Sequence, residues 1–195
     1  MYIANVHIEN FRNFTAIDVP LKQFTIIAGK NDTGKSNLID AINILLYNSK
    51  GNYYAKSLSK YDFNVKCISE FTSKMKIVYE NVKSDFKPDD YIEEIIKNSP
   101  TVIIRLRFQD PKTSYEQDLL RCWLNGDESL QFFEIEYKYY LKDRKKLNTL
   151  ISNLQKEGLL DEHYADFQLI LECYDHNLRS TNNNKGIDYS QIKNF

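Results

Sequence analysis

The pattern of apolar and polar residues predicts a chain that alternates strands with helices. Residues 2–9 alternate between apolar and mostly polar positions, which is typical of a strand buried on one face. Residues 16–19 form a second short strand that Pro20 ends, and the largely apolar run 24–28 predicts a third, buried strand. Across 38–46, apolar residues recur at the spacing of one helix face.

The alternation continues along the rest of the chain, apart from 67–82, where helix and strand signals are mixed. The patterns predict helices at 88–97, 114–124 and 143–155, and strands at 101–108, 130–141 and 167–173. The predicted fold class is therefore α/β. We expect a central sheet that mixes parallel and antiparallel strands, with the helix 38–46 on one face and the other helices inserted between strands.

A glycine-rich octet joins the predicted strand 24–28 to the helix that follows. It fits the pattern G-x-x-x-x-G-K-S of phosphate-binding loops and comprises Gly29, Lys30, Asn31, Asp32, Thr33, Gly34, Lys35 and Ser36. Such a turn points successive backbone N–H groups inward and ends on a helix N-terminus, which favours anions. The octet and its strand–helix setting predict a nucleotide site and a P-loop NTPase.

The fixed positions of this loop each have a chemical reason. Gly29 and Gly34 keep Cβ atoms away from the phosphates and permit positive φ. Lys35 is expected to reach the β- and γ-phosphates, and the Ser36 hydroxyl to ligate Mg²⁺. The cofactor predicted on these grounds is a nucleotide with Mg²⁺.

Composition narrows the classes of protein further. The net charge of −1 excludes a general polycation, so any DNA binding must come from a local patch. No apolar run approaches the length of a membrane helix, and the N-terminus has no signal-peptide pattern. The three cysteines (Cys67, Cys122 and Cys173) lie far apart, which indicates free thiols in a reducing compartment. We therefore expect a cytoplasmic protein without a membrane partner.

The first 48 residues resemble the N-terminus of the ABC-type chromosome and repair ATPases, namely RecF, the SMC proteins and the OLD family. The run VHIENFRNFTAIDVPLKQFTIIAGKNDTGKSNLIDAINILL carries the shared opening. Positions that match it are Ile8, Asn10, Phe11, Arg12, Phe14, Gly29, Asn31, Gly34, Lys35, Ser36, Asn37, Leu38, Ala41 and Ile42. The resemblance implies the N-terminal lobe of an ABC-type ATPase and makes ATP the expected nucleotide.

Three short runs are most similar to OLD-type proteins, including the ATPase–nuclease subunit of Gabija-type antiviral defence. They are FRNF, GKNDTGKSN and the YDF of residues 61–63. The family's adenine-side contact makes Arg12 and Asn13 candidate nucleotide ligands beside Asn37; alternatively, Arg12 and Asn13 only shape a β-turn. Related ATPases also carry a glutamine that senses Mg²⁺ and the γ-phosphate, so Gln109 is a candidate for that role, or a polar strand end.

Two further patterns have competing interpretations. Asp161 and Glu162 follow two leucines, as in a Walker B strand, but a buried strand needs about four apolar residues, so we interpret the pair as a decoy. The aromatic strand 130–141 runs into the basic stretch 142–146, which could stack on and neutralise nucleic acid or simply be solvated.

These observations predict an incomplete N-terminal P-loop ATPase domain over 1–176 and a flexible connector or tail over 177–195. No convincing Walker B strand, signature motif or acidic nuclease cluster is found in the sequence, so the catalytic residues stay unknown and turnover by this chain stays open. The expected function is ATP binding that, in the complete protein, couples hydrolysis to action on DNA. We expect a homo-oligomer through the ATPase heads. The alternatives are a DNA-tethering ATPase without a nuclease and a nucleotide sensor without turnover.

Overall fold

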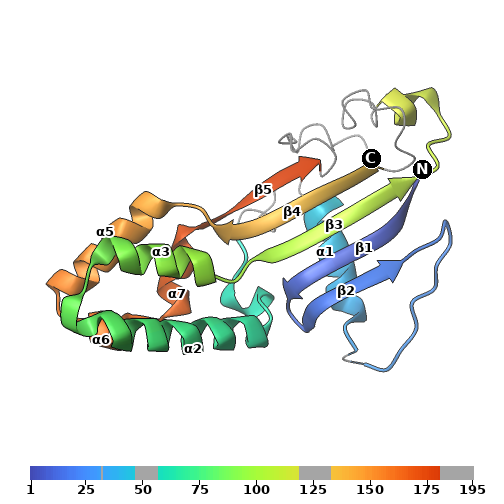
Figure 1. The fold of residues 1–195 in the computed structure, drawn as a ribbon. Helices are drawn as coiled ribbons and strands as arrows, with labels where there is room; N and C mark the ends of the chain where they lie inside the picture. The colour runs from blue at the N-terminus through green and yellow to red at the C-terminus, as the bar shows by residue number, and fades with distance from the viewer. Residues whose placement is uncertain (32, 47–56, 119–132, 181–195) are drawn as a thin grey trace.

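The computed structural model describes residues 1–31, 33–46, 57–118 and 133–180 and is built on one five-stranded sheet (Figure 1). The strand order is β2-β1-β3-β4-β5, and all four pairings are antiparallel. The strands are β1 (Tyr2–Phe11), β2 (Phe14–Pro20), β3 (Val102–Gln109), β4 (Phe133–Leu141) and β5 (Tyr174–Ser180). The α/β fold class is thus confirmed, although the expected parallel pairing is not found among the described strands.

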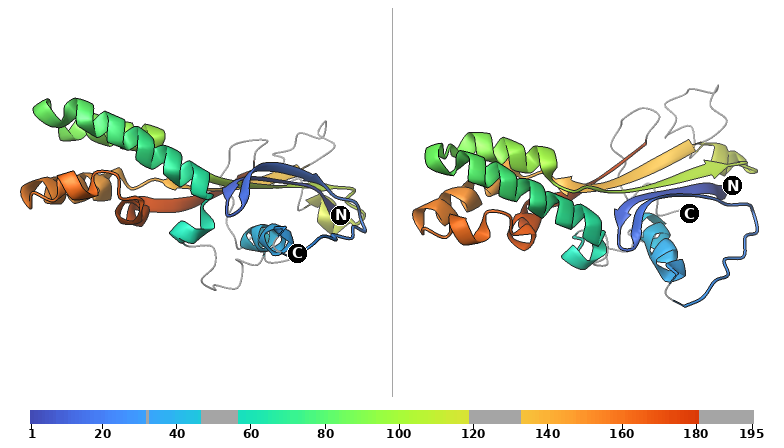
Figure 2. Two further views of the ribbon diagram at one scale, coloured as in Figure 1. Left: turned by 90° about the horizontal axis from the view of Figure 1, so that it is seen from below. Right: turned by 60° about the horizontal axis from the view of Figure 1, so that its bottom comes forward.

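Each face of the sheet has its own composition because side chains alternate along a strand. On β3, Val102, Ile104, Leu106 and Phe108 are buried, whereas the residues between them are only partly buried. Helix α1 (Lys35–Leu46) covers the apolar face and packs on β1 and β3 (Figure 2). Its buried residues are Leu38, Ala41, Ile44 and Leu45. The helical period of the sequence therefore places α1 against the sheet as predicted.

Helices α2, α3, α5, α6 and α7 gather at one end of the sheet and form what we call the helical lobe, whereas the helical residues 114–118 lie near its other end (Figures 1 and 2). Between β2 and β3 the chain forms η2 (Lys60–Asp62), α2 (Val65–Val82), η3 (Lys83–Asp85) and α3 (Pro88–Asn98). Between β4 and β5 it forms α5 (Arg144–Lys156), α6 (Leu160–His163), α7 (Phe167–Ile170) and η4 (Leu171–Cys173). The insertion of helices between strands is thus confirmed.

An aromatic cluster joins the helical lobe to the sheet. The Phe63 ring is buried, and its centroid lies 4.9 Å from that of Phe167 on α7 and 5.6 Å from that of Tyr174 on β5. Tyr139 on β4 completes the cluster, 6.0 Å from Phe63. Edge-to-face aromatic contacts of this kind add to the stabilisation from burial. Phe63 therefore fixes the segment before α2 against strands that are far away in the sequence.

The predicted strand at 24–28 is wrong for this chain. Residues 22–30 are all exposed, and the exposed fractions of Phe24 and Ile26 are 80% and 76%. Among the described residues, no strand pairs with this segment. An isolated strand leaves its backbone N–H and C=O groups unpaired. Among the described residues, this segment thus has no neighbouring strand to pair its backbone, and no layer buries its apolar side chains.

The predicted strand at 167–173 is also wrong. These residues form α7 and η4, and the Asp166 side chain caps α7 by accepting a hydrogen bond from the Gln168 backbone N–H. Phe167 and Ile170, three positions apart, are both buried. The strand follows instead at Tyr174–Ser180, so residues 177–180 of the predicted connector belong to β5. Residues 181–195 lie outside the described part of the chain.

The opposite face of the sheet carries ion pairs that run across neighbouring strands. Glu136 on β4 is 1% exposed and accepts hydrogen bonds from Arg105 on β3, at 2.6 Å, and Arg179 on β5, at 2.8 Å. His7 on β1 lies between Glu9 and Asp18, with ring nitrogen to carboxylate distances of 2.6 and 3.0 Å. His7 therefore lies on the partly exposed face of β1, in an ion-pair network.

The charge on His7 is expected to make folding stability depend on pH. Burial lowers the pKa of His7, but hydrogen bonds to Glu9 and Asp18 outweigh it and raise the pKa above its ordinary value. The stabilisation is therefore fully present below about pH 6.5 and is lost as the pH rises through the folded-state pKa. Urea unfolding of His7→Gln should show its largest deficit on the acid side, shrinking toward pH 8. A deficit of the same size at every pH would contradict this.

Replacing the buried Glu136 should cost more than replacing an exposed partner of arginine. Glu136→Gln removes the negative charge that two arginines share, and we expect a loss of about 2 kcal/mol in the free energy of unfolding. Glu93 pairs with Arg144 at 2.5 Å but is 57% exposed, so Glu93→Gln should cost less than about 1 kcal/mol. Urea titration of both variants measures the difference, and equal losses would show that burial of Glu136 is unimportant.

Candidate functional site

The glycine-rich loop leads directly into the first turn of α1. The helix begins at Lys35, and its first regular backbone bond runs from the Leu38 N–H to the Gly34 carbonyl at 2.9 Å. The first N–H groups of a helix have no acceptor within the helix. Those of Lys35, Ser36 and Asn37 are therefore available at the end of the loop, where the helix dipole favours an anion.

Side chains of the loop close it on itself. The Lys35 ammonium donates hydrogen bonds to the carbonyls of Gly29, at 2.7 Å, and Lys30, at 2.5 Å. The Thr33 hydroxyl donates to the Lys30 carbonyl at 2.9 Å. The ammonium thus spans the loop, with its charge directed at the loop interior. This arrangement brings a cation and free backbone N–H groups into one place.

Gly34 is required by both its backbone conformation and its surroundings. Its φ is +95°, a conformation that residues with a Cβ rarely adopt. A Cβ at this position would lie 2.5 Å from the Asn13 amide nitrogen and 2.9 Å from the Phe14 ring. The turn between β1 and β2 therefore packs directly against the end of the phosphate-binding loop.

The same turn holds α1 through side-chain hydrogen bonds. Asn37 donates from its amide to the Asn13 side-chain oxygen at 2.7 Å. The Arg12 guanidinium donates to the Asn37 side chain at 3.1 Å, to Asp40 at 2.5 Å and to Asp62 at 3.0 Å. The structure thus brings Arg12, Asn13 and Asn37 together beside the loop. Arg12 and Asn13 do shape the turn, and they also bind α1.

The other predicted site residues are placed as follows. Ser36 lies in the first turn of α1, at its N-terminus. Asp32 lies outside the described residues. Gln109 ends β3 opposite Tyr2, whereas the Asn13–Asn37 contact lies beyond Phe11, at the other end of β1. A strand of this length spans about 30 Å, so the structure does not bring Gln109 to the loop, and its role stays a prediction.

Asp161 and Glu162, which the sequence led us to interpret as a decoy, do not follow a strand in the structure. Both lie on the short helix α6. Asp161 accepts hydrogen bonds from the Tyr79 hydroxyl and the Lys83 ammonium, each at 2.7 Å, which ties α2 and η3 to α6. Since a Walker B acid follows a buried strand, neither residue is placed to hold Mg²⁺. Among the described residues, no group of three or more His, Cys, Asp or Glu could hold a metal ion.

The basic stretch after β4 is largely neutralised by carboxylates. Lys142 pairs with Asp175 at 2.9 Å, Arg144 with Glu93 at 2.5 Å and Lys146 with Glu172 at 3.3 Å. The solvated interpretation of this stretch therefore fits better than a nucleic-acid contact. No helix in the described part of the chain is long and apolar enough to cross a membrane.

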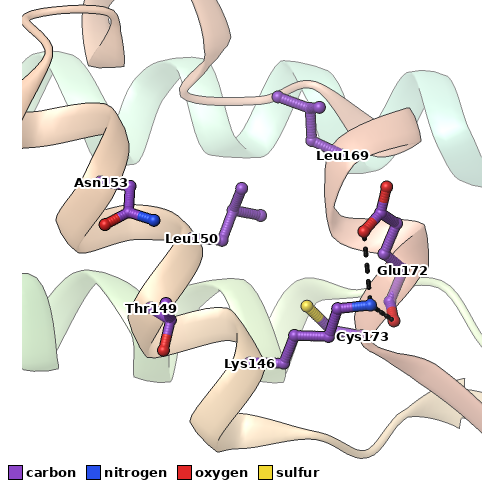
Figure 3. Close-up of a pocket in the computed structure, with 7 residues that line it drawn as sticks. All are labelled: Lys146, Thr149, Leu150, Asn153, Leu169, Glu172 and Cys173. Atoms are coloured by element: carbon purple, nitrogen blue, oxygen red, sulfur yellow. Dashed lines mark hydrogen bonds and ion pairs between the residues drawn. The ribbon is translucent and has the colours of Figure 1, made fainter.

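A pocket of about 260 Å³ lies in the helical lobe between α5 and η4 (Figure 3). The Lys146 ammonium lies across it and donates to the Glu172 backbone carbonyl at 3.0 Å. Burial raises the pKa of the Cys173 thiol to about 11, so this lining residue is a poor nucleophile. The pocket therefore offers no reactive group and does not include the loop.

Sequence reasoning missed the two acids that hold Arg12 outside the phosphate-binding loop, Asp40 and Asp62. Asp40 follows Asn37 on α1 by three positions, so the two side chains share a face and both reach Arg12. Asp62 belongs to the YDF run, whose resemblance to OLD-type proteins predicts no role for the acid. Its carboxylate accepts from Arg12 and from the Ser59 backbone and hydroxyl. A search for acids able to pair with Arg12 would have suggested both residues.

Comparison with known proteins agrees with this geometry. A family model described as an AAA ATPase domain matches residues 1–194. The DNA replication and repair protein RecF of Cytophaga hutchinsonii is 24% identical over 209 residues, which cover 91% of this chain and 49% of the relative. RecF of Rickettsia canadensis is 25% identical over 192 residues, which cover 85% of this chain and 51% of the relative.

The endonuclease GajA of Bacillus cereus is 29% identical over 98 residues, which cover 49% of this chain and 16% of GajA. The chain thus spans about half the length of the RecF relatives and a smaller part of GajA. The phosphate-binding loop, the turn packed against it and these matches lead to one conclusion: the chain belongs to the AAA ATPase domain family, and within it to the RecF/OLD-type group.

Proposed function

We propose that the chain binds Mg-ATP at the loop of residues 29–36. The observation that carries this proposal is the convergence of the Lys35 ammonium, the positive-φ Gly34 and the N-terminus of α1. Backbone N–H groups at a helix start and a lysine across the loop are the groups that cradle nucleotide phosphates. Membership of an ATPase family supports ATP as the nucleotide.

Several residues of the loop and of the start of α1 have a proposed part in binding. Lys35 neutralises the β- and γ-phosphates, and the Ser36 hydroxyl ligates Mg²⁺. Asn31, Asp32 and Thr33 supply backbone groups, and Asn37 holds the start of α1. Mg²⁺ would neutralise charge that develops on the phosphates during transfer.

We further propose that the complete protein is a cytoplasmic ATPase that couples ATP hydrolysis to action on DNA, in pairs of ATPase heads. The names of the relatives, a DNA repair protein and an endonuclease, support action on DNA. The exposed apolar segment at 24–28 and the half-length match to RecF support a larger complete ATPase. In one version, the complete protein carries a C-terminal nuclease, which the similarity to an endonuclease supports, and acts in phage defence, as the resemblance to Gabija-type proteins implies.

The alternative is a RecF-like ATPase without a nuclease. It is favoured by the extent of the RecF match, which covers 91% of this chain, against 49% for GajA. Incubating the complete protein with DNA, Mg²⁺ and ATP separates the two versions. Cleavage would favour the nuclease version, and ATP-dependent binding without cleavage the RecF-like one. Nucleotide binding without turnover or DNA binding would indicate a sensor.

Removing the Lys35 ammonium should abolish tight nucleotide binding. In Lys35→Ala we expect at least about a tenfold loss of affinity for Mg-ATP, because charge-assisted hydrogen bonds to phosphate are lost. Isothermal titration calorimetry measures it. Glu162→Gln is the control, and it should bind as the wild type does because Glu162 lies on α6. Unchanged binding by Lys35→Ala would contradict the proposed site.

A methyl group at Gly34 should weaken nucleotide binding through steric clashes as well as through backbone strain. Gly34→Ala adds a clash with Asn13 and Phe14 to the cost of positive φ, so nucleotide binding and thermal stability should both fall. Gly158 also has a positive φ, of +69°, but a Cβ there would meet nothing within 4 Å. Gly158→Ala should therefore lose only about 1 kcal/mol of stability and keep its affinity. Equal effects of the two variants on binding would show that the packing on Gly34 is unimportant.

A further inference from the structure

A short polar link connects the helix of the phosphate-binding loop to the segment that begins α2. Its centre is the Arg12 guanidinium, which donates to Asp40 on α1 at 2.5 Å and to Asp62 on η2 at 3.0 Å. Asp62 comes two residues before Asn64, the N-cap of α2. One side chain thus bridges two elements that belong to different parts of the molecule.

The backbone around Arg12 is held firmly on the same segment. Asn10 and Arg12 have φ values of 56° and 48°, a region that costs about 1 kcal/mol or more in most residues with a Cβ and less in asparagine. Such conformations persist when the surroundings fix them. Here the Arg12 N–H donates to the Asp62 carbonyl at 2.9 Å, and Asn64 donates to the carbonyls of Asn10 and Arg12 at 2.9 and 2.7 Å.

The far side of the link is equally fixed. Asp62 accepts hydrogen bonds from the Ser59 N–H and hydroxyl at 3.0 and 2.8 Å, so its carboxylate has one orientation toward Arg12. Phe63, the next residue, is 1% exposed and packs against α7 and β5 in the aromatic cluster. A displacement of Asp62 is therefore passed on to the packed interior of the helical lobe.

The near side of the link is the helix turn that the nucleotide would use. Asn37 and Asp40 hold Arg12, and they lie on the first two turns of α1, directly after the free N–H groups of the loop. A packed, hydrogen-bonded connection transmits a shift at one end because it cannot deform continuously. Binding at the loop and the position of α2 are therefore joined through Arg12.

We propose that Arg12 is a positioning residue that couples occupancy of the phosphate-binding loop to the start of α2 through Asp40 and Asp62. This inference rests on the proposed function of the loop and adds a regulatory connection to the helical lobe. It differs from a direct contact of Arg12 with the nucleotide, in which Asp62 would have no part. It also differs from a purely structural role of Arg12, which would affect the stability of the fold but leave the response of α2 to nucleotide unchanged.

The test is hydrogen exchange of the full chain, with and without Mg²⁺ and a non-hydrolysable ATP analogue, in peptides that cover residues 57–71. In the wild type, nucleotide should slow exchange of the first amides of α2 by about tenfold, at the low end of usual coupling factors. Asp62→Asn removes the ionic half of the link, and its response should fall below about twofold while its affinity stays within about threefold of the wild type.

Two further variants make the result specific. Asp161→Asn is the matched control, because Asp161 binds the other end of α2, through Tyr79 and Lys83, and does not contact α1. It should keep the wild-type response. Asp40→Asn breaks the link on the α1 side at a residue that is 46% exposed, so it is the variant to use if Asp62→Asn does not fold. It should lose the response as Asp62→Asn does.

Each other outcome overturns the proposal in a distinct way. A wild-type response in Asp62→Asn or Asp40→Asn would show that α2 is reached without Arg12. Binding by the wild type without any change at α2 would remove the coupling but leave the proposed nucleotide site intact. If the wild type does not bind the analogue, both the proposed function and the coupling are contradicted.

Discussion

The connection between the turn of β1 and β2, helix α1 and the segment before α2 depends on the ion pairs of Arg12 with Asp40 and Asp62. Without them, the turn between β1 and β2 would contact α1 mainly through Asn13 and the packing on Gly34. The guanidinium suits this role because its planar set of donors reaches several acceptors at once and keeps its charge. Arg12 itself has a φ of 48°, an unfavourable backbone conformation that the hydrogen bonds to Asp62 and Asn64 hold in place.

The apolar segment before the loop is exposed and pairs with none of the described strands. Phe24 and Ile26 are both largely exposed, and Ile39 on α1 is half exposed. Large apolar side chains exposed along one segment are typical of a contact with another structural layer. This exposed segment and the half-length match to RecF are the observations on which the proposal of a larger complete ATPase rests.

Several arginine and lysine side chains of this molecule are paired with carboxylates, and this pairing reduces the charge that they could offer to DNA. Across the sheet, Glu136 balances Arg105 and Arg179, and the basic stretch after β4 is paired with acids of neighbouring elements. Because DNA binding draws on unpaired cations that can replace counterions, these paired residues contribute little to it. A basic patch for DNA is therefore not formed by Arg105, Arg179 or the paired residues of the basic stretch.

The sequence by itself determined the phosphate-binding loop, the helix after it, the two-faced strands and the family. These features follow from local spacing: glycine at fixed positions, a helical repeat in 38–46, and alternation in β1 and β3. The strand predicted at 24–28 had an equally clear local pattern but was wrong, because a strand also needs a partner. At 167–173 a capping aspartate, Asp166, favoured a helix over the apolar run.

Only the tertiary structure decided what Arg12, Asp40 and Asp62 do. Residues 12, 40 and 62 are far apart in the chain, and no spacing rule relates them. Their contact exists because β1, α1 and the segment before α2 meet at one end of the sheet. The same holds for Gln109. A glutamine was a suitable residue type for the nucleotide site, but its position on β3 lies opposite Tyr2, at the other end of β1 from the loop. Local patterns fix the elements and the chemistry of the loop, whereas long-range packing decides which side chains share a site.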